Sequence, residues 1–300
     1  MRQKVLVIGS MNYDIILSAS RLPELGETMP VDGCTFAAGG KGANQAVQAA
    51  KLGVETYMVG CVGTDPMGDF LVKTAEGYGL HTDYVRRCDA PTGLGVVHAL
   101  GAGVVHASIV RGANFELTEK DIDAVEPLMD ETGLVILQME IPLDINRYAI
   151  DKAKAHGCRI LLNAAPAEAF EKEYLAKCDI LVVNEVEAAF YAGKTASSLE
   201  EGCAMAAEMA ADLKNTCIVT MGKEGAAVSD GTRSEMVPSL KVKAVETTGA
   251  GDSFIGGIAY AVINGMDIFE GSRFATKCSA VTVCRAGAQN SMPVLSEVSG

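Results

Sequence analysis

Short apolar, β-branched runs alternate with helical patterns along the chain, and this alternation restricts the fold more than any other feature. Most runs are apolar at consecutive positions, so strands formed by them must be buried on both faces. Such strands, separated by helices, pair in parallel and need helices on both sides of the sheet. The expected fold is therefore α/β, with a doubly wound, mostly parallel sheet. The runs are 5–9, 55–62, 134–138, 159–163, 180–184 and 216–220.

Residues typical of helix ends separate these runs. Glycine follows three of the helical segments, and one of these begins with Pro66, directly after Asp65, at the first helical position, where a proline costs no hydrogen bond. We therefore expect helices at 41–52, at 66–78, from Thr118 with Asp121 in the first turn, and at 142–156.

Two regions interrupt the alternation, because strand-like runs follow one another there without a helix. They span 14–36 and 93–110, and the second turns at 101–103. We interpret them as a small separate β-sheet that acts as a lid and excludes water from a reacting centre. The alternative is an extension of one edge of the main sheet. The expected organisation is one domain over 1–300, with lid strands inserted at about 13–37 and 92–111 and with His98 and His106 as strand residues.

The charge balance argues against several classes of partner. The 300 residues include 38 acidic and 25 basic side chains, a net charge of −13, and no basic stripe that could follow a phosphate backbone. Nucleic acids and anionic membranes are therefore not expected as partners. The apolar stretches are shorter than the roughly 20 residues of a membrane span, and the start of the sequence lacks an export signal. A cytoplasmic protein is expected.

The cysteines and histidines indicate neither disulfides nor a metal centre. Nine cysteines is an odd number, none forms a CxxC pair, and they are interpreted as reduced thiols of the core. The four histidines show no spacing typical of zinc ligands. A zinc site is therefore not expected.

Neither common nucleotide-binding fingerprint is present. The segment Gly193-Lys194-Thr195 resembles the end of a P-loop, but Ala188 stands where that motif requires glycine, so we interpret the segment as a loop. After the first strand, residues 9–14 read GSMNYD instead of G-x-G-x-x-G, which argues against a dehydrogenase.

A glycine-rich segment, AGGKGANQA at 38–46, includes the start of the helix at 41–52. Its glycines would expose backbone N–H groups at a helix start, with Lys41 and Asn44 nearby, a combination that suits hydroxyls or anions. A glycine-rich turn can equally be a structural corner, and the residues alone leave both interpretations open.

A second segment, VETTGAGD at 245–252, follows a strand predicted at 241–245 and precedes a helix that starts near Ser253. Backbone N–H groups at that helix start would form an anion hole for the charge on a transferring phosphoryl group. Asp252 beside them could take the proton of an attacking hydroxyl as a general base. Its alternative role is that of an ordinary helix N-cap. The N–H groups belong to Gly249, Ala250 and Gly251.

Two further segments follow strands in the second half of the chain. Asn184 and Glu187 place an amide and a carboxylate three residues apart on one helical face, where they could hold Mg²⁺-bound phosphate through water. A capped helix start is the alternative. The second segment, a turn whose backbone could approach a nucleotide, contains Thr220, Gly222 and Gly225.

In this order the four segments resemble the ribokinase-like carbohydrate kinase family, and the match runs from Gly9 to about Pro293. The two most specific stretches, 39–46 and 249–252, are similar to the two signatures of that family. Ala164 stands where the family usually has proline. Supporting matches are 9–14, 63–65, 163–167, 184–187 and 287–289.

The resemblance implies phosphoryl transfer from Mg²⁺-ATP to the terminal hydroxyl of a small sugar, with Asp252 as catalytic base and the amides of 249–251 as the anion hole. The implied sugar-binding residues are Asn12, Asp14, Gly40, Lys41, Asn44, Glu140 and Asp252. The implied ATP-binding residues are Asn184, Glu187, Thr220, Gly222, Gly225, Gly251 and Thr276.

The implied acceptor is ribose, phosphorylated at its 5-hydroxyl. A site built from carboxylates and amides rejects an analogue that lacks a hydroxyl, so the presence of Asn12 favours ribose over deoxyribose. Deoxyribose, fructose and nucleosides stay open as acceptors, because lid residues set the shape of the pocket. A rival of another class is a non-catalytic sugar-binding sensor on the same fold. The lid residues in question are Ile15, Ile16, Phe36 and Val97.

The resemblance also implies a homodimer paired through the lid and a monovalent-cation loop beside the anion hole. Glu246 stands where the family usually has aspartate, and its additional methylene leaves activation by K⁺ open. The implied cation-binding residues, most of them through backbone carbonyls, are Glu246, Thr248, Thr282, Arg285, Gly287 and Ser291.

Overall fold

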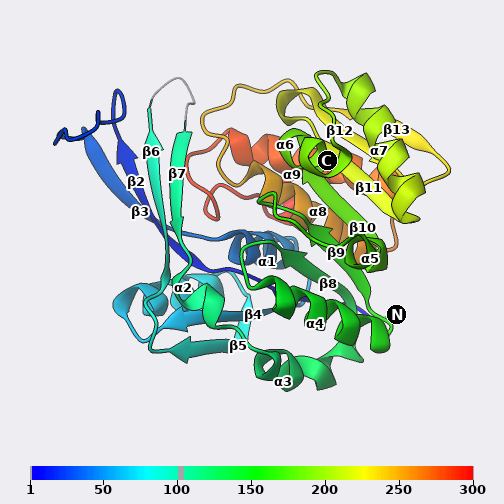
Figure 1. Ribbon diagram of the computed structural model, residues 1–300, viewed down its shortest axis with the longest axis horizontal. Coiled ribbons are helices and arrows are strands. Elements are labelled where there is room, and N and C mark those ends of the chain that lie inside the picture. Colours follow the sequence, from blue (N-terminus) through cyan, green and yellow to red (C-terminus); the bar gives the residue numbers. More distant parts are fainter. Residues whose placement is uncertain (1, 101–104, 300) are drawn as a thin grey trace.

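The computed structural model describes residues 2–100 and 105–299, and nine of the described strands form one sheet (Figure 1). They are β1 (Lys4–Ile8), β4 (Thr56–Gly63), β5 (His81–Cys88), β8 (Thr132–Gln138), β9 (Arg159–Asn163), β10 (Ile180–Asn184), β11 (Thr216–Thr220), β12 (Gly225–Ser229) and β13 (Ser234–Pro238). Their order is β13-β12-β11-β10-β9-β8-β1-β4-β5. Neighbours pair in parallel from β5 to β11, and β11–β12 and β12–β13 are antiparallel. The expected mostly parallel sheet is confirmed.

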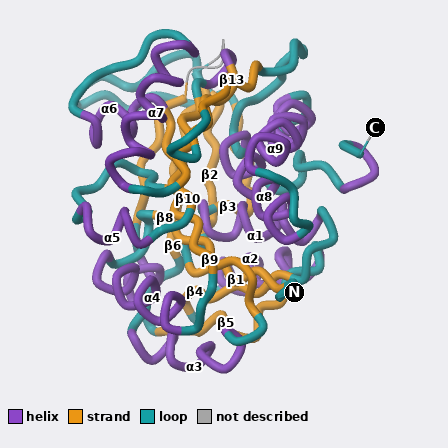
Figure 2. Tube along the Cα trace, turned by 90° about the vertical axis from the view of Figure 1, so that its right-hand side faces the viewer, coloured by secondary structure: helices purple, strands orange, loops and turns teal. Residues whose placement is uncertain are grey.

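Helices cover both faces of this sheet, as Figure 2 shows. On one face lie α1 (Lys41–Lys51), α2 (Pro66–Gly77), α8 (Ala250–Ile263) and α9 (Ile268–Val283). On the other lie α3 (Glu119–Met129), α4 (Leu143–Ala155), α5 (Lys172–Lys177), α6 (Glu185–Ala192) and α7 (Leu199–Leu213). Alternate residues of β1 enter the two resulting cores, Val5 and Val7 in one and Leu6 and Ile8 in the other. The doubly wound architecture is therefore confirmed.

A second, smaller sheet stands apart from the main one and projects from the body in Figure 1. Its strands are β2 (Asn12–Ser18), β3 (Gly33–Gly39), β6 (Gly93–Ala99) and β7 (Val105–Val110), in the order β3-β2-β6-β7. Since none of these strands pairs with the main sheet, the separate sheet is confirmed and the edge extension is wrong. His98 pairs with His106 across β6 and β7, and the turn expected at 101–103 lies outside the described residues.

Two local predictions around the second glycine-rich segment are wrong. Residues 241–245 form no strand, because the chain leaves the sheet edge after Pro238 and crosses to α8 without a strand to pair with. The apolar side chains of Leu240 and Val242 line a cavity instead. Helix α8 begins at Ala250 rather than near Ser253, directly after Gly249 in the left-handed conformation at φ +77°.

The structure also bears on the expectations for the segment at 193–195, for the cysteines and for membrane-spanning helices. Helix α6 ends at Gly193 in the left-handed conformation, and Lys194 pairs with Glu208, so the segment at 193–195 is a loop as expected. All nine cysteines are free thiols, but Cys34 and Cys284 are exposed, so the assignment of every cysteine to the core is wrong for these two. Within 2–100 and 105–299 no helix combines the length and the apolar character needed to cross a bilayer.

Candidate active site

Helix α1 begins directly against the loop between β1 and β2, and glycine is required there. A Cβ atom on Gly42 would lie 2.6 Å from Ser10 N. One on Gly40, whose φ is +88°, would lie 2.7 Å from Asn12 N. Because no side chain fits between these backbones, the glycines allow the first turn of α1 to lie against the start of β2.

The backbone amides at the start of α1 are already used inside the protein. Lys41 N–H donates to Glu140 Oε2 at 3.2 Å, and Ser10 Oγ donates to the same oxygen at 2.6 Å. Gly42 N–H donates to Ser10 Oγ at 3.3 Å, and Ala43 N–H donates to Ser10 O at 2.9 Å. The expectation that the glycines of this segment offer free N–H groups to a ligand is therefore wrong for Gly42, and the N–H groups of its neighbours Lys41 and Ala43 are occupied as well. Its side chains are left to bind.

Asp14 of β2 lies in a slot between the neighbouring strands. A Cβ atom on Gly39 of β3 would lie 2.0 Å from Asp14 Oδ2, and one on Gly95 of β6 would lie 2.2 Å from Oδ1. Two neighbours without side chains therefore provide the space for this carboxylate. Its burial, together with the charges of Glu140 and Asp252, raises the pKa of Asp14 to about 7.

Lys41 supplies positive charge among these carboxylates. Burial lowers the pKa of its ammonium group, but the charges of Asp252, Glu140 and Glu187 outweigh that effect and raise the pKa above its usual value. The Lys41 side chain is therefore protonated at neutral pH.

The carboxylate of Asp252 is held by two amides of α1. Asn44 Nδ2 donates to Oδ2 at 2.9 Å, and Gln45 Nε2 donates to Oδ1 at 2.9 Å. Burial raises the pKa of Asp252, and the charge of Lys41 and these two hydrogen bonds lower it in part. The helix N-cap is Gly249, and the Asp252 side chain bonds α1 instead of its own helix start, so the N-cap interpretation of Asp252 is wrong.

A further layer of glutamines orients those two amides. Gln289 Nε2 donates to Asn44 Oδ1 at 3.0 Å, and Gln138 Nε2 donates to Gln45 Oε1 at 2.8 Å. Each chain of donors ends on one oxygen of Asp252. Sequence reasoning assigned no role to Gln45, Gln138 or Gln289, although two of them lie inside stretches that matched the family. Only their contacts with distant residues reveal what they do.

The start of α8 keeps more of its backbone amides available than the start of α1. Ala250 N–H donates to Thr247 O at 3.2 Å, a long bond within the turn. Among the described residues, Gly251 N–H has no backbone acceptor, and Gly251 is exposed. An N–H group of this kind at a helix start attracts negative charge.

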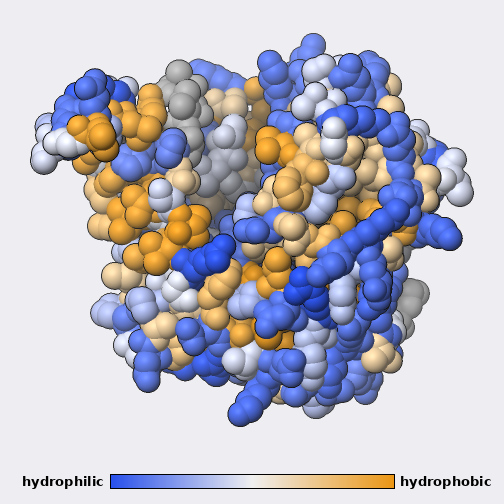
Figure 3. All heavy atoms as spheres, in the orientation of Figure 1, coloured by the Kyte–Doolittle hydropathy of each residue, from blue (hydrophilic) through white to orange (hydrophobic). Residues whose placement is uncertain are grey.

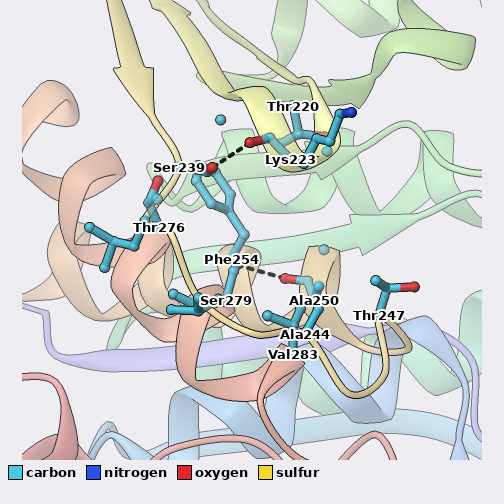
Figure 4. Close-up of a pocket in the computed structure, with 16 residues that line it drawn as sticks. Thr220, Lys223, Ser239, Ala244, Thr247, Ala250, Phe254, Thr276, Ser279 and Val283 are labelled. Atoms are coloured by element: carbon cyan, nitrogen blue, oxygen red, sulfur yellow. Dashed lines mark hydrogen bonds between the residues drawn. The ribbon is translucent and has the colours of Figure 1, made fainter. Parts of the chain in front are cut away.

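A cavity of about 370 Å³ opens beside this helix start (Figure 4). Figure 4 shows Thr247 and Ala250 at one side and Thr220 at the other, with Phe254 between them. Ser279 Oγ donates to Ala250 O at 2.8 Å, which ties α9 to α8 at the cavity wall. Five of the seven residues expected at ATP line it, namely Thr220, Gly222, Gly225, Gly251 and Thr276.

The other two, Asn184 and Glu187, do not line this cavity and form a reciprocal cap of α6. Asn184 Oδ1 accepts the N–H groups of Val186 and Glu187 at 2.8 and 2.9 Å. The Glu187 carboxylate accepts Asn184 N–H at 2.7 Å and Asn184 Nδ2 at 3.0 Å. The capped helix start, the alternative weighed for this pair, is therefore present. Burial raises the pKa of Glu187.

Two more cavities adjoin the small sheet. One of about 230 Å³ is lined by Asn12 and Glu140 from the expected sugar set and by Arg111, Asn114 and residues around Pro166. The other, of about 1120 Å³, lies between the small sheet, α2 and the loops around 244–248 and 286–290. Figure 3 shows the surface hollowed between the projecting sheet and the body. The small sheet therefore borders open space on its inner side.

The residues expected to hold a monovalent cation lie around the loops that flank α8 and α9. Glu246 accepts Gly287 N–H at 2.8 Å, and Thr248 lines the large cavity with both. Thr282 Oγ1 donates to Ser253 Oγ at 2.8 Å, between the two helices. The Arg285 guanidinium pairs with Glu297 and lies 3.5 Å from the carbonyl oxygen of Ser291.

Comparison with known proteins shows which family the chain belongs to. Residues 2–295 match the pfkB family of carbohydrate kinases. The chain belongs to that family. Ribokinase of Schizosaccharomyces pombe is 35% identical, over 99% of this chain and 96% of its own. Deoxyribokinase of Salmonella typhi is 34% identical, over 98% of this chain and 96% of its own.

A solved structure agrees with this membership of the carbohydrate kinases. The ribokinase of Arabidopsis thaliana, described as a complex with ribose and ATP, superposes with a TM-score of 0.89 at 32% identity. The match covers 99% of this chain and 98% of that one. The resemblance inferred from the glycine-rich segments is confirmed, and the chain is a carbohydrate kinase.

The slot around Asp14 generates a first prediction. In Gly95→Ala the new methyl group displaces the Asp14 carboxylate, so we expect KM for the sugar acceptor to rise about tenfold or more with a smaller change in kcat. Steady-state kinetics measure the split. Gly77→Ala is the matched control, because a Cβ there meets nothing within 4 Å, and it should leave KM unchanged. An unchanged KM in Gly95→Ala would show that the slot does not position Asp14 for the acceptor.

The hydrogen bonds donated to Asp252 by Asn44 and Gln45 lead to a second prediction. Gln45→Met removes one N–H donor, so the pKa of Asp252 rises and the acidic limb of the pH profile of kcat/KM moves to higher pH. Since the carboxylate also loses orientation, kcat falls about tenfold to a hundredfold. The control is Gln48→Met, one turn along α1, which breaks bonds to Pro293 O and Ser253 Oγ without touching Asp252. A limb that shifts equally in both variants would contradict the assignment.

Proposed function

We propose that this carbohydrate kinase transfers the γ-phosphoryl group of ATP to the 5-hydroxyl of ribose. The observation that carries the proposal is the position of Asp252. Asp252 directly follows Gly251, which lines the 370 Å³ cavity, its carboxylate accepts hydrogen bonds from Asn44 and Gln45 of α1, and its charge acts on Asp14 of the small sheet. One acidic group is thus within reach of a nucleotide on one side and of a sugar on the other. The Arabidopsis thaliana ribokinase described with ribose and ATP supports both ligands.

Asp252 is the general base of the proposed reaction. The O–H bond of the sugar hydroxyl breaks as its proton passes to the carboxylate, the hydroxyl oxygen bonds the γ-phosphorus, and the bond from phosphorus to the departing ADP oxygen breaks. Burial that raises the pKa of Asp252 makes it a stronger proton acceptor than an exposed aspartate. The amides of Asn44 and Gln45 keep it aimed.

The remaining expected residues divide between the two ligands. Negative charge that develops on the phosphoryl group is stabilised by Lys41 and by the N–H groups of Gly249, Ala250 and Gly251, with that of Ala250 shared with Thr247 O. The proposed sugar ligands are Asn12, Asp14, Gly40, Lys41, Asn44 and Glu140. The proposed ATP contacts are Thr220, Gly222, Gly225, Gly251 and Thr276, with Asn184 and Glu187 facing the phosphates through water.

Mg²⁺ fits this arrangement as a companion of the nucleotide. Among the described residues no group of three or more acidic, cysteine or histidine side chains could hold a metal. Mg²⁺ keeps much of its water and binds phosphate oxygens, so we propose that it arrives with the nucleotide. Glu187, whose carboxylate oxygens each accept a single N–H, is the proposed partner of its water shell. The ion would neutralise phosphate charge, and the protein would supply orientation.

The acceptor is the part of this proposal that relatives do not decide, since a ribokinase and a deoxyribokinase match almost equally. Asn12 favours ribose, and we place its amide at the 2-hydroxyl, the group that deoxyribose lacks. In an assay of ADP release with ribose, 2-deoxyribose, fructose and nucleosides, we expect the highest kcat/KM with ribose, at least tenfold above 2-deoxyribose. A higher kcat/KM with any other acceptor would refute ribose while leaving the kinase chemistry intact.

The role of Asp252 has its own test. Asp252→Asn keeps the shape of the side chain and removes its basicity, so we expect kcat to fall by about 10²- to 10⁴-fold while the variant still binds ribose. Calorimetric titration with ribose checks that binding survives. Near-normal turnover would remove Asp252 from the mechanism. A wild-type protein that is stabilised by sugars but forms no ADP with any of them would favour the non-catalytic sensor.

Three further features belong to the proposal. The small sheet acts as a lid inserted at about 13–37 and 92–111, and two subunits pair through it, which the exposed side chains of Phe36, Ile109 and Val110 support. A monovalent cation binds where the Glu246 carboxylate accepts Gly287 N–H, near the carbonyl groups of 248 and 282, and lowers the negative charge beside the anion hole.

The dimer and the cation each have their own measurement. Sedimentation analysis tests whether two subunits pair, and a comparison of initial rates in potassium chloride and in choline chloride tests whether a monovalent cation activates the enzyme.

A further inference from the structure

Asn12 is oriented by a buried neighbour that sequence reasoning did not single out. This neighbour is Asn114, in the short helix η1 (Gly112–Glu116) that follows β7. Met11 N–H donates to Asn114 Oδ1 at 2.8 Å, and Asn114 Nδ2 donates to Asn12 Oδ1 at 2.7 Å. Both asparagines are at most 2% exposed. The three residues form a relay of hydrogen bonds that runs from a backbone amide to the wall of the 230 Å³ cavity.

The direction of this relay is fixed by its first member. A backbone N–H can only donate, so the atom of Asn114 that faces Met11 must be the oxygen. The other atom of Asn114 is then the NH₂ group, and the atom of Asn12 that faces it must be the oxygen. Asn12 therefore turns its own NH₂ group toward the cavity, and among the described residues that group has no hydrogen-bond partner.

The neighbouring strand leaves space for the relay. Asn12 is paired with Gly93 of β6, and a Cβ atom on Gly93 would lie 2.2 Å from Asn114 Nδ2 and 2.5 Å from Asn12 Oδ1. Any side chain at 93 would displace the hydrogen bond between the two asparagines. The backbone of β6 and the side chain of Asn114 thus act together on one amide.

We propose that Asn114 is a positioning residue that holds Asn12 as a hydrogen-bond donor and thereby selects acceptors that carry a hydrogen-bond-accepting atom at the sugar position read by Asn12. This inference rests on the proposed function, in which that position is the 2-hydroxyl of ribose. A hydroxyl satisfies the donor through its oxygen. Fluorine at the same position still accepts weakly, whereas an ammonium group can only donate and faces the NH₂ group without a bond.

Two ribose analogues separate these cases. We would measure kcat and KM for 2-deoxy-2-fluororibose and for 2-amino-2-deoxyribose at a pH at which the amine is protonated. The wild-type enzyme is expected to prefer the fluoro analogue. In Asn114→Leu the Asn12 amide loses its fixed orientation, so the ratio of the two kcat/KM values falls about tenfold, mostly through KM. A merely structural role would lower stability and leave that ratio unchanged.

Asn114→Asp gives a sharper test and keeps the buried position polar. The aspartate still accepts Met11 N–H but offers no donor to Asn12, so the Asn12 amide must turn and present its oxygen to the cavity. The preference then reverses in favour of the amino analogue. Because the substitution also adds one negative charge, the matched control is Arg111→Gln, which changes the charge of the same cavity by one in the same direction. Its ratio should stay within about twofold of wild type.

The orientation is also measured without turnover, from the side-chain NH₂ signals of Asn12 in ¹H–¹⁵N spectra. In the wild type these hydrogens should exchange quickly with solvent, and in Asn114→Asp they should become protected. Protected hydrogens in the wild type, or an unchanged analogue ratio in both Asn114 variants, would overturn the inference. A wild type that phosphorylates no ribose at all refutes the proposed function instead, and the NH₂ signals then decide whether Asn114 orients Asn12.

Discussion

The two hydrogen bonds that Asn44 and Gln45 donate to Asp252 join parts of the chain more than 200 residues apart. They connect the N-terminal part of α1 with the first turn of α8, whose Ala250 and Gly251 line the 370 Å³ cavity. Each bond comes from an amide whose own oxygen accepts from a glutamine. A carboxylate with both oxygens held in this way keeps one direction, which is what a proton transfer at a fixed place requires.

Carboxylates outnumber ammonium groups around this junction, and neighbouring hydrogen-bond donors compensate for part of the negative charge. Besides burial, the negative charge of Glu140 raises the pKa of both Asp14 and Asp252, so these carboxylates repel one another. The ammonium group of Lys41 attracts those of Asp252 and Glu140 and supplies the opposite charge. Burial of several carboxylates is unfavourable unless hydrogen bonds and an opposite charge compensate for it. The cluster therefore combines one ammonium group, several amides and two carboxyl groups, those of Asp14 and Asp252, whose pKa values burial raises. In a chain with a net charge of −13, anionic ligands depend on these local groups.

The glycines around this site are as important as its polar side chains. Gly40 and Gly42 let α1 approach the start of β2, Gly39 and Gly95 make room for Asp14, and Gly93 makes room for the bond between Asn114 and Asn12. In each case the glycine leaves space for a polar group of another segment. The glycine-rich character of the sequence thus serves the placement of side chains more than the exposure of backbone amides, which at α1 are taken by Ser10 and Glu140.

Local patterns in the sequence were enough for the layered architecture, the approximate bounds of six strands of the main sheet and of the first four helices, the separate small sheet and the family, because hydrophobic periodicity and short motifs are properties of neighbouring residues. The prediction of a strand at 241–245 was wrong, because the segment alternates like a strand but has no partner strand beside it. Only the tertiary structure decided that Asp252 bonds α1 instead of capping its own helix, that the amides of α1 are occupied, and which way the amide of Asn12 faces. These outcomes depend on hydrogen bonds between residues roughly 30 to 250 positions apart, and no local pattern encodes which donor will meet which acceptor.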